Sequence, residues 1–427
     1  MWGISAGWRN RWRKLFCKME NIIIAIMVSL MAMTSSALVF PFVLQFAKDH
    51  DIVDNPNARK LQRVPVPVMG GLVVYSGILT GCLLLMALRP EPILAWGLVA
   101  MTVMLIIGMW DDMKELSAAF RFMVEIVLVG VFIWKSGYYI DNLHGLWGVH
   151  EIEPWIGIPL SVFTGVGLIN AVNLIDGVDG YSSGYGMLAS VCFAIAFHSV
   201  WSMTMVFVAV IVIGAMLPFF MHNVFGVRSK MFIGDGGTLM LGMLLVMFLF
   251  AALSSRSKCD GMEARNVGLV AMTLAVLCIP IFDTLRVMTM RILRGKSPFR
   301  PDRTHLHHLF IDMGFSHLGA AASILTINLG VVIVWFATWL LGASIDVQLY
   351  VVVALGVAVT FGFYHQMKVE QNGGPLDEEG YPTGTALWHA LRKIGASSHR
   401  EKGRLWRSLR WLMDRQVMGR TVRAMKG

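Results

Sequence analysis

Long apolar runs constrain this sequence more than any other feature. About eleven runs are long enough to cross a bilayer as helices, and 56% of the 427 residues are hydrophobic. Because a soluble globule exposes far fewer apolar residues, we predict an all-α, polytopic integral membrane protein. The predicted spans lie near residues 21–46, 68–88, 91–110, 119–136, 155–172, 182–199, 201–221, 236–253, 267–286, 318–341 and 348–366.

These runs divide the chain into three parts: a basic N-terminal segment (residues 1–20), a transmembrane domain (21–366) and a basic tail (367–427). In the tail, tryptophan, leucine and methionine recur at helical spacing among arginines. This pattern predicts either a helix on an anionic membrane surface or a solvated tail. The five cysteines show no spacing typical of a zinc site or a disulfide framework.

An odd number of spans places alternate connections on opposite faces. The connections with unusual polar motifs then share one face. Together with the tail, and leaving out Arg121 and Arg286 at helix ends, this face carries 24 Lys and Arg residues, against 10 on the other face. This bias predicts a cytoplasmic face, although the basic first twenty residues alone argue for the reverse. The net charge of +9 therefore reflects topology and anionic lipid or phosphate partners, and no motif suggests nucleic acid. The shared connections are 47–67, 111–118, 173–181, 222–235 and 287–317.

Polar residues gather directly after the fifth apolar run, in the sequence NAVNLIDGVDGYSSG. Asn170, Asn173, Asp176 and Asp179 lie there among glycines that allow sharp turns beside a ligand. A calcium loop is excluded because Val178 occupies the place of an oxygen ligand. A turn between two helices is the structural alternative, but a carboxylate at the membrane boundary is costly and is usually functional.

Further carboxylates flank apolar runs on the same face. Asp111 and Asp112 are adjacent and repel each other unless a cation compensates them, or they cap the next helix. Arg121 begins that helix and is placed either to contact a phosphate or to extend to the interface. Asp235, in the sequence FIGDGG, is expected to be a helix cap or a metal ligand.

The longest connection on this face contains PFRPDRTHLHHLF. Zinc is disfavoured because the glutamate of an HExxH helix is missing and Arg303 would repel a nearby cation. Arginine together with His305, His307 and His308 suits a pyrophosphate better, with a basic cytoplasmic loop and incidental histidines as the alternative.

Carboxylates and cations on one face together suit a metal-bound diphosphate. Mg²⁺ takes oxygen ligands from a few carboxylates and from substrate phosphates, while arginines neutralise the remaining oxygens. A transporter of a phosphorylated metabolite should instead place its charges near mid-membrane on broken helices. A metal-dependent membrane hydrolase would use the same metal without a lipid acceptor.

The ordered motifs PNARKLQRVPVPVMGG, GMWDDMKELSAAFR, NAVNLIDGVDGYSSG, FIGDGG and PFRPDRTHLHHLF resemble those of the polyprenyl-phosphate N-acetylhexosamine-1-phosphate transferase family. The HLHH form resembles the bacterial undecaprenyl-phosphate N-acetylglucosamine-1-phosphate transferase branch more than the phospho-MurNAc-pentapeptide branch. The resemblance implies transfer of a sugar 1-phosphate, with GlcNAc-1-phosphate expected, from a UDP-sugar to undecaprenyl phosphate, releasing UMP. It implies Mg²⁺ (or Mn²⁺) as cofactor, a place in the bacterial inner membrane and in a cell-surface polysaccharide pathway, and it leaves a homodimer open.

The resemblance also implies residue roles. Asp235 with Asn173 would hold Mg²⁺, and Asp111 would align or deprotonate the lipid phosphate. Phe232 would stack on uracil, and Asp179 would form a hydrogen bond with its edge. The catalytic carboxylates would be Asp111, Asp112 and Asp176, and the other substrate-binding residues Arg121, Asn170, Arg303, His305, His307 and His308.

Overall fold

The computed structural model describes residues 6–54, 64–199, 202–257, 262, 264–299, 303–371 and 407–415. Helices dominate these residues. The long helices are α1 (Ala6–Asp49), α2 (Gly70–Leu88), α3 (Pro92–Lys114), α4 (Ala118–Ser136), α5 (Pro154–Asn173), α6 (Tyr181–Ser199), α7 (Met203–Phe225), α8 (Gly234–Leu253), α13 (His317–Leu340) and α14 (Ile345–Gln371). The shorter elements are α10 (Leu269–Val276), α11 (Cys278–Leu293), α12 (Leu306–Asp312), η1 (Ser255–Ser257), β1 (Val53–Asp54), β2 (Val66–Pro67), β3 (Asn142–Leu146) and β4 (Val149–Glu151).

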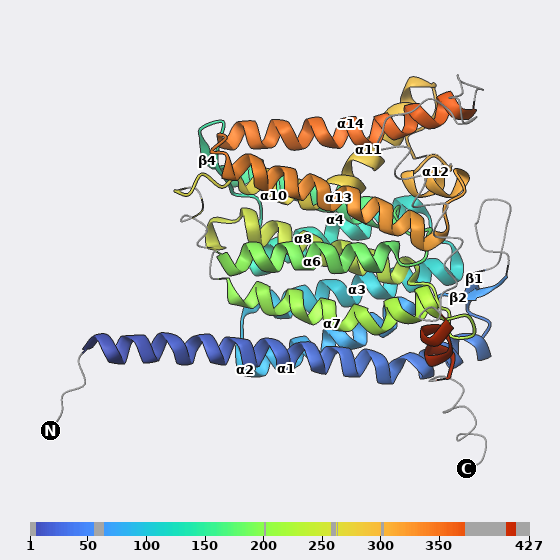
Figure 1. Cartoon of the computed structure of the whole chain (residues 1–427), viewed down its shortest axis with the longest axis horizontal. Helices are drawn as coiled ribbons and strands as arrows, with labels where there is room; N and C mark the ends of the chain where they lie inside the picture. The colour runs from blue at the N-terminus through green and yellow to red at the C-terminus, as the bar shows by residue number, and fades with distance from the viewer. Residues whose placement is uncertain are drawn as a thin grey trace, which may run out of the picture.

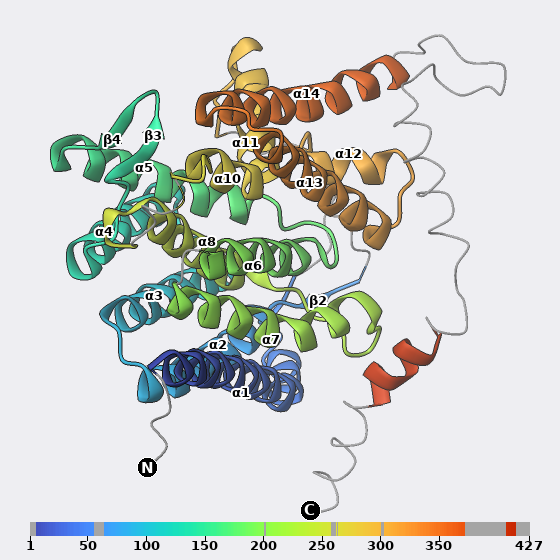
Figure 2. The ribbon, with the colours of Figure 1, turned by 60° about the vertical axis from the view of Figure 1, so that its left-hand side comes forward.

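The long helices lie side by side and run between the two ends of one bundle (Figure 1). α1 and α14 lie on opposite sides, with α8 between them (Figure 2). Apart from Asp235 in its first turn, α8 is almost wholly apolar and buried, as expected of a helix without a polar stripe. The pair β1–β2 and α12 lie at one end of the bundle, and the hairpin β3–β4 lies at the other. We call the end with α12 the site end.

Each predicted span coincides with helix in the structure, which confirms a polytopic membrane protein. Within the described residues, eight helices are long and apolar enough to cross a membrane, or nine if one bent pair counts as a span. The count of eleven is therefore not confirmed. Two predicted spans, α4 and α6, are not among these eight helices; α4 carries Arg121, Glu125 and Lys135, and α6 begins with Tyr181 and Ser182.

The ninth predicted span is broken where the sequence suggested one continuous helix. α10 and α11 meet at an angle of 74°. A side chain of α13 satisfies the interrupted backbone: Asn328 Nδ2 donates to Val276 O at 3.0 Å, and Asn328 Oδ1 accepts from Ile279 N at 3.1 Å. Such side-chain partners allow a helix to break at membrane depth.

Glycines let three helices approach closely at the site end. A Cβ on Gly108 of α3 would lie 2.4 Å from the backbone nitrogen of Gly236 in α8. A Cβ on Gly71 of α2 would lie 2.4 Å from the nitrogen of Gly237. Larger residues would separate these backbones. The packing therefore brings the last turn of α3 against the first turn of α8.

Candidate active site

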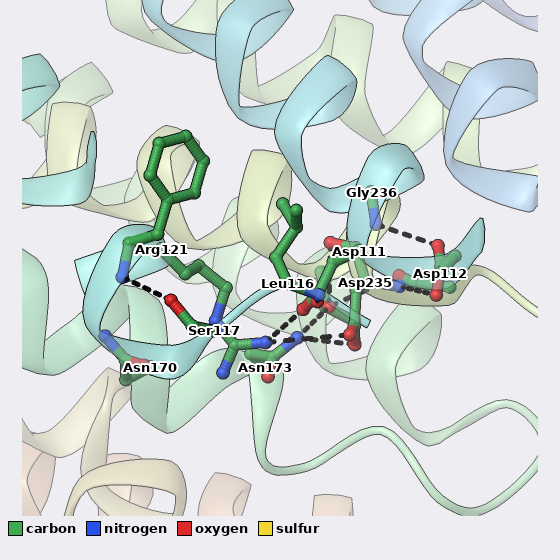
Figure 3. Close-up of polar contacts among 12 residues, drawn as sticks. Asp111, Asp112, Leu116, Ser117, Arg121, Asn170, Asn173, Asp235 and Gly236 are labelled. Atoms are coloured by element: carbon green, nitrogen blue, oxygen red, sulfur yellow. Dashed lines mark hydrogen bonds and ion pairs between the residues drawn. The ribbon is translucent and has the colours of Figure 1, made fainter. Parts of the chain in front are cut away.

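Arg121 joins carboxylates from two different helices (Figure 3). Its Nη1 donates to Asp111 Oδ2 at 2.5 Å and lies 3.7 Å from Asp235 Oδ2. The other oxygen of Asp111 accepts from Leu116 N at 2.6 Å. Asp111 lies in the last turn of α3, where the helix dipole disfavours a carboxylate. The guanidinium compensates for this cost and ties α3, α4 and α8 together.

Asp112 caps α8 instead of the next helix in sequence. Its carboxylate accepts from the backbone nitrogens of Asp235 at 3.0 Å and Gly236 at 3.3 Å. The cap of α4 is supplied by Ser117. Gly234 has φ +74, and a Cβ there would lie 2.6 Å from Asp112 Oδ2. Glycine is therefore required for this close approach, and Asp112 fixes the backbone that presents Asp235.

The two predicted asparagines have different surroundings. Asn173 Nδ2 donates to Asp235 Oδ1 at 2.9 Å and to Thr238 Oγ1 at 2.8 Å. Asn170 instead donates to the buried carboxylate of Glu125, which lies 4.0 Å from Arg121 Nε. Asn173 thus contacts the carboxylate of Asp235 directly, whereas Asn170 contacts Glu125, which in turn lies beside Arg121.

Asp176 lies on the connection between α5 and α6 and accepts a hydrogen bond from Ser182 at 3.1 Å. Burial raises the pKa of Asp176 to about 7, the Ser182 hydroxyl opposes the rise, and nearby Asp235 and Asp179 add to it. Burial and the neighbouring carboxylates therefore both disfavour the charged form of Asp176, and a bound cation nearby would favour it.

Asp179 is paired with Lys230 and His317, which the sequence analysis did not select. Its Oδ2 lies 2.6 Å from Lys230 Nζ and 3.0 Å from His317 Nδ1. Burial alone would raise the pKa of Asp179, but His317 and Lys230 outweigh it and hold the pKa below its usual value. Asp179 Oδ1 is buried and has no hydrogen-bond partner among the described residues. Lys230 also lies 5.5 Å from the centre of the Phe232 ring.

His305 belongs to a buried ion-pair group. Its Nδ1 lies 3.0 Å from Asp283 Oδ2, and Arg286 Nη2 donates to Asp283 Oδ1 at 2.6 Å. Arg286 is fully buried, and within the described part of the chain its Nε and Nη1 have no hydrogen-bond partner, as is also true of His305 Nε2. Buried polar groups without partners are expensive, so the two free N–H groups of Arg286 are well suited to an anion.

His307 brings the helix α12 into contact with the connection between α5 and α6, which carries Asp176 and Asp179 and which we call the aspartate connection. A Cβ on Gly177 would lie 2.6 Å from His307 Nε2, so only glycine permits the contact. Burial, then the neighbouring His308 and His305, lower the pKa of His307 well below its usual value, so it is neutral at pH 7. Arg303 lies at the rim, 3.5 Å from Asp312 and 39% exposed.

The oxygen donors fit a hard divalent cation only in combination with substrate. Within the described part of the chain, no three His, Cys, Asp or Glu side chains are close enough to hold a metal by themselves. Mg²⁺ is usually held by one or two carboxylates and by substrate phosphates, so a preformed three-residue site is not required. Asp235 is partly exposed beside Asp111 and Asp112, and suits this role.

Some basic residues of the predicted motifs fall outside the described residues. These are Arg59, Lys60 and Arg63 before β2 and Arg300 in the histidine motif; Trp406 of the tail pattern also lies outside them. The described end of the first motif reaches the site: Phe232 N donates to Pro67 O at 2.8 Å.

Glu125, Lys230, Asp283, Arg286 and His317 are site-end residues that the sequence analysis missed. Asp283 and Arg286 lie within a predicted span, where a charged pair is a recognisable functional signal. His317 is the first residue of α13 and Lys230 belongs to an ordinary basic connection, so neither carries a local signal.

Comparisons with known proteins agree with this arrangement. The family model described as glycosyl transferase family 4 matches residues 94–253. A probable undecaprenyl-phosphate N-acetylglucosaminyl 1-phosphate transferase of Bacillus subtilis is 28% identical over 340 residues, covering 79% of this chain and 90% of the relative. The undecaprenyl-phosphate alpha-N-acetylglucosaminyl 1-phosphate transferase of Escherichia coli K12 is 30% identical over 282 residues, covering 64% of this chain and 73% of the relative.

Proposed function

Because the chain belongs to the polyprenyl-phosphate N-acetylhexosamine-1-phosphate transferase family, we propose that it transfers GlcNAc-1-phosphate from UDP-GlcNAc to undecaprenyl phosphate. The products are a lipid diphosphate sugar and UMP. The general activity, transfer of a sugar 1-phosphate to a polyprenyl phosphate, follows from family membership. The donor sugar and the residue roles are the proposal.

One observation carries the proposal. Carboxylates from α3 and α8 meet Arg121, and Asp176 of the α5–α6 connection lies near Asp235, at the same end of the bundle as the buried histidines of α12. A transporter site would instead lie near mid-membrane on broken helices. The mixture of acidic and basic groups instead suits a metal-bound diphosphate presented at a membrane surface.

We assign the nucleotide to the region around Asp179, Lys230 and Phe232. Asp179 Oδ1 has no hydrogen-bond partner among the residues that the structure describes, and it can accept from the N–H of uracil. Lys230 is near both Asp179 and the Phe232 ring. A uracil stacked on Phe232 would therefore have a hydrogen-bond acceptor at its edge and a cation beside it.

The diphosphate is assigned to the cationic groups on either side of the aspartate connection. Among the described residues, Nε and Nη1 of Arg286 are buried donors without hydrogen-bond partners, and His305 Nε2 is a buried ring nitrogen beside them that also lacks one. His307, which is neutral, can donate one hydrogen bond without adding charge. Arg303 is partly exposed and adds a positive charge that attracts an incoming anion.

Asp235 and Asp112, assisted by the Asn173 amide, are the residues that would hold Mg²⁺. When bound, the ion would neutralise charge on the transferring phosphoryl group. Asp112 also has a role that requires no metal, since it holds the first turn of α8 through two backbone hydrogen bonds.

The transfer itself is an in-line displacement at phosphorus. An oxygen of the lipid phosphate forms a bond to the sugar-bearing β-phosphorus, and the bond from that phosphorus to the bridging oxygen of UMP breaks. Asp111 keeps Arg121 directed at the cluster, and Arg121 stabilises negative charge on the transferring group. Asp176, with its raised pKa, is a carboxylate that can hold or release a proton near pH 7.

The site is assigned to the cytoplasmic face of a bacterial inner membrane. The face that contains these motifs holds 24 of the 36 Lys and Arg residues. UDP-sugars are charged and made in the cytoplasm, so a site on that face meets its donor without transport.

Release of UMP tests the proposal. Purified protein with UDP-GlcNAc, Mg²⁺ and undecaprenyl phosphate should release UMP, and omission of the lipid should abolish the release. A panel with UDP-GalNAc and UDP-MurNAc-pentapeptide tests the sugar. Release without lipid would identify a hydrolase, and transfer from UDP-MurNAc-pentapeptide alone would place the chain in the other branch of the family.

A further inference from the structure

A helix of the C-terminal tail is fastened to the connection between α7 and α8. One carboxylate oxygen, Asp414 Oδ1, accepts from the backbone nitrogens of Val227 at 3.1 Å, Arg228 at 3.0 Å and Ser229 at 3.2 Å. It also accepts from Ser229 Oγ at 3.2 Å. Consecutive backbone N–H groups directed at one anion form a strong site, because each bond is charge-assisted.

The neighbouring residue anchors the same helix in the bundle. Met413 is 6% exposed. It lines a cavity of about 440 Å³ with residues of α1 and α7 that include Pro41, Leu217 and Met221. The helix, residues 407–415, lies near the site end of α1 (Figure 1). An apolar anchor beside a charged one fixes both the position and the orientation of the helix.

The connection held by Asp414 carries Lys230. Directly after Ser229, Lys230 reaches Asp179 at 2.6 Å. Beyond it, Asn223 Nδ2 donates to Met231 O at 2.9 Å, so the chain is fixed again one residue later. Lys230 thus lies between two anchored segments. Asp414 holds the upstream one through its backbone N–H groups, together with Lys48, whose Nζ donates to Arg228 O at 2.9 Å, and His222, whose Nδ1 lies 3.1 Å from Ser229 Oγ. Only the peptide bond between Ser229 and Lys230 separates the segment held by Asp414 from the ion pair of Lys230 with Asp179.

We propose that Asp414 is a positioning residue for the donor-nucleotide site. It holds the backbone of residues 227–229 so that Lys230 meets Asp179 and lies beside Phe232. This inference rests on the assignment of UDP-GlcNAc to that side of the site. The carboxylates of the transfer step are held separately, because Asp112 caps α8 and Arg121 binds Asp111. Asp414 therefore affects donor binding and not the transfer step.

Steady-state kinetics of the full-length protein test this separation. Asp414→Ala should raise KM for UDP-GlcNAc by about fivefold or more and change kcat by less than about twofold. Asp414→Asn should recover most of the affinity, because its amide oxygen still accepts backbone hydrogen bonds. Arg415→Ala is the matched control, since this exposed neighbour makes none of these contacts. An unchanged KM in Asp414→Ala, or an equal loss in Arg415→Ala, would overturn the proposal.

A double-mutant cycle tests whether Asp414 acts through Lys230. Lys230→Ala should raise KM, and adding Asp414→Ala should raise it little further, because the residue being positioned is already gone. Fold-changes that multiply would show that Asp414 acts elsewhere.

Amide hydrogen exchange separates this inference from the proposed function, because it needs no turnover. Asp414→Ala should accelerate exchange at residues 227–229, while Asp414→Asn and Arg415→Ala should not. If the wild-type protein shows no transfer, the function fails while the exchange result still decides whether the anchor exists. Unchanged exchange in Asp414→Ala, with normal wild-type transfer, would refute the anchor alone.

Discussion

At the scale of single residues, the site end is a set of charges that are balanced only in part. Arg121 compensates Asp111, and Lys230 compensates Asp179, which also lies 3.0 Å from His317 Nδ1. Burial, with further contributions from Asp235 and Asp179, raises the pKa of Asp176 to about 7. Buried carboxylates with shifted pKa values are typical of functional sites.

The charge of Asp235 should be indispensable. Asp235→Asn should lower turnover by about two to three orders of magnitude and weaken the dependence of rate on Mg²⁺, because an amide is a poor ligand for a hard cation. Initial rates over a Mg²⁺ titration measure both effects. Asp346→Asn is the control, since Asp346 lies in the first turn of α14 and accepts from Trp147 N. Near-normal activity of Asp235→Asn at low Mg²⁺ would remove Asp235 from the metal site.

Asp176 should make the free protein less stable as pH rises. Its folded pKa of about 7 lies above its ordinary value of 3.8, so between these values the folded state binds more protons than the unfolded state. Stability contributed by the neutral carboxyl is therefore lost as pH rises through about 7. Asp176→Asn, which stays neutral, should have a higher Tm than wild type at pH 8, with the difference shrinking toward pH 5. A constant difference across this range would contradict the raised pKa.

At the scale of elements, glycines decide how closely the functional segments approach one another. Gly177 contacts His307, and Gly234 contacts Asp112, in each case where a Cβ would lie 2.6 Å from a side-chain atom. His307 is buried and cannot move aside freely. The aspartate connection and the histidine helix α12 are thus brought together by the absence of a side chain.

Gly177→Ala should therefore reduce activity strongly, by about tenfold or more, through displacement of His307. Gly167→Ala is a matched control: it lies in α5 only ten positions earlier, and a Cβ there has nothing within 4 Å. Transfer rates and Tm of both variants provide the comparison. Equal activities of the two variants would show that the contact between Gly177 and His307 is not needed.

The helices and the shared site face could be predicted from the sequence, because apolar runs and their alternation depend on local composition. The partners of individual side chains could not be predicted from the sequence. Lys230 and Asp179 are 51 residues apart, and His317 is 138 residues from Asp179. Nothing in local periodicity specifies such contacts. The bend between α10 and α11 was also missed, because its stabilising partner, Asn328, lies on another helix.

At the scale of the whole molecule, the chain passes back and forth so that widely separated connections meet at one end (Figure 1). β1–β2, the ends of α3 and α5, the start of α8 and the short helix α12 all lie there. The tail helix 407–415 joins the same end through the α7–α8 connection. The site end therefore holds both the candidate catalytic groups and the tail helix 407–415.

Cysteine labelling tests which face this is. On a background without the five native cysteines, Ser297→Cys should resist an impermeant thiol reagent in intact cells and react in inverted vesicles, because it lies between α11 and α12. Ser257→Cys, at the opposite end, should give the reverse pattern. Labelling of Ser297→Cys from outside would reverse the orientation assigned here.

The fate of the β-phosphate is the most direct test of the central claim, that a sugar 1-phosphate moves from a nucleotide to a lipid phosphate. UDP-GlcNAc labelled with phosphorus-32 at the β-phosphate is incubated with the purified protein, Mg²⁺ and undecaprenyl phosphate. The account predicts that the label enters the lipid fraction as a diphosphate-linked sugar and that the released UMP is unlabelled. Label in UDP would indicate transfer of the sugar alone, and label in free GlcNAc-1-phosphate would indicate hydrolysis; either result would contradict the account.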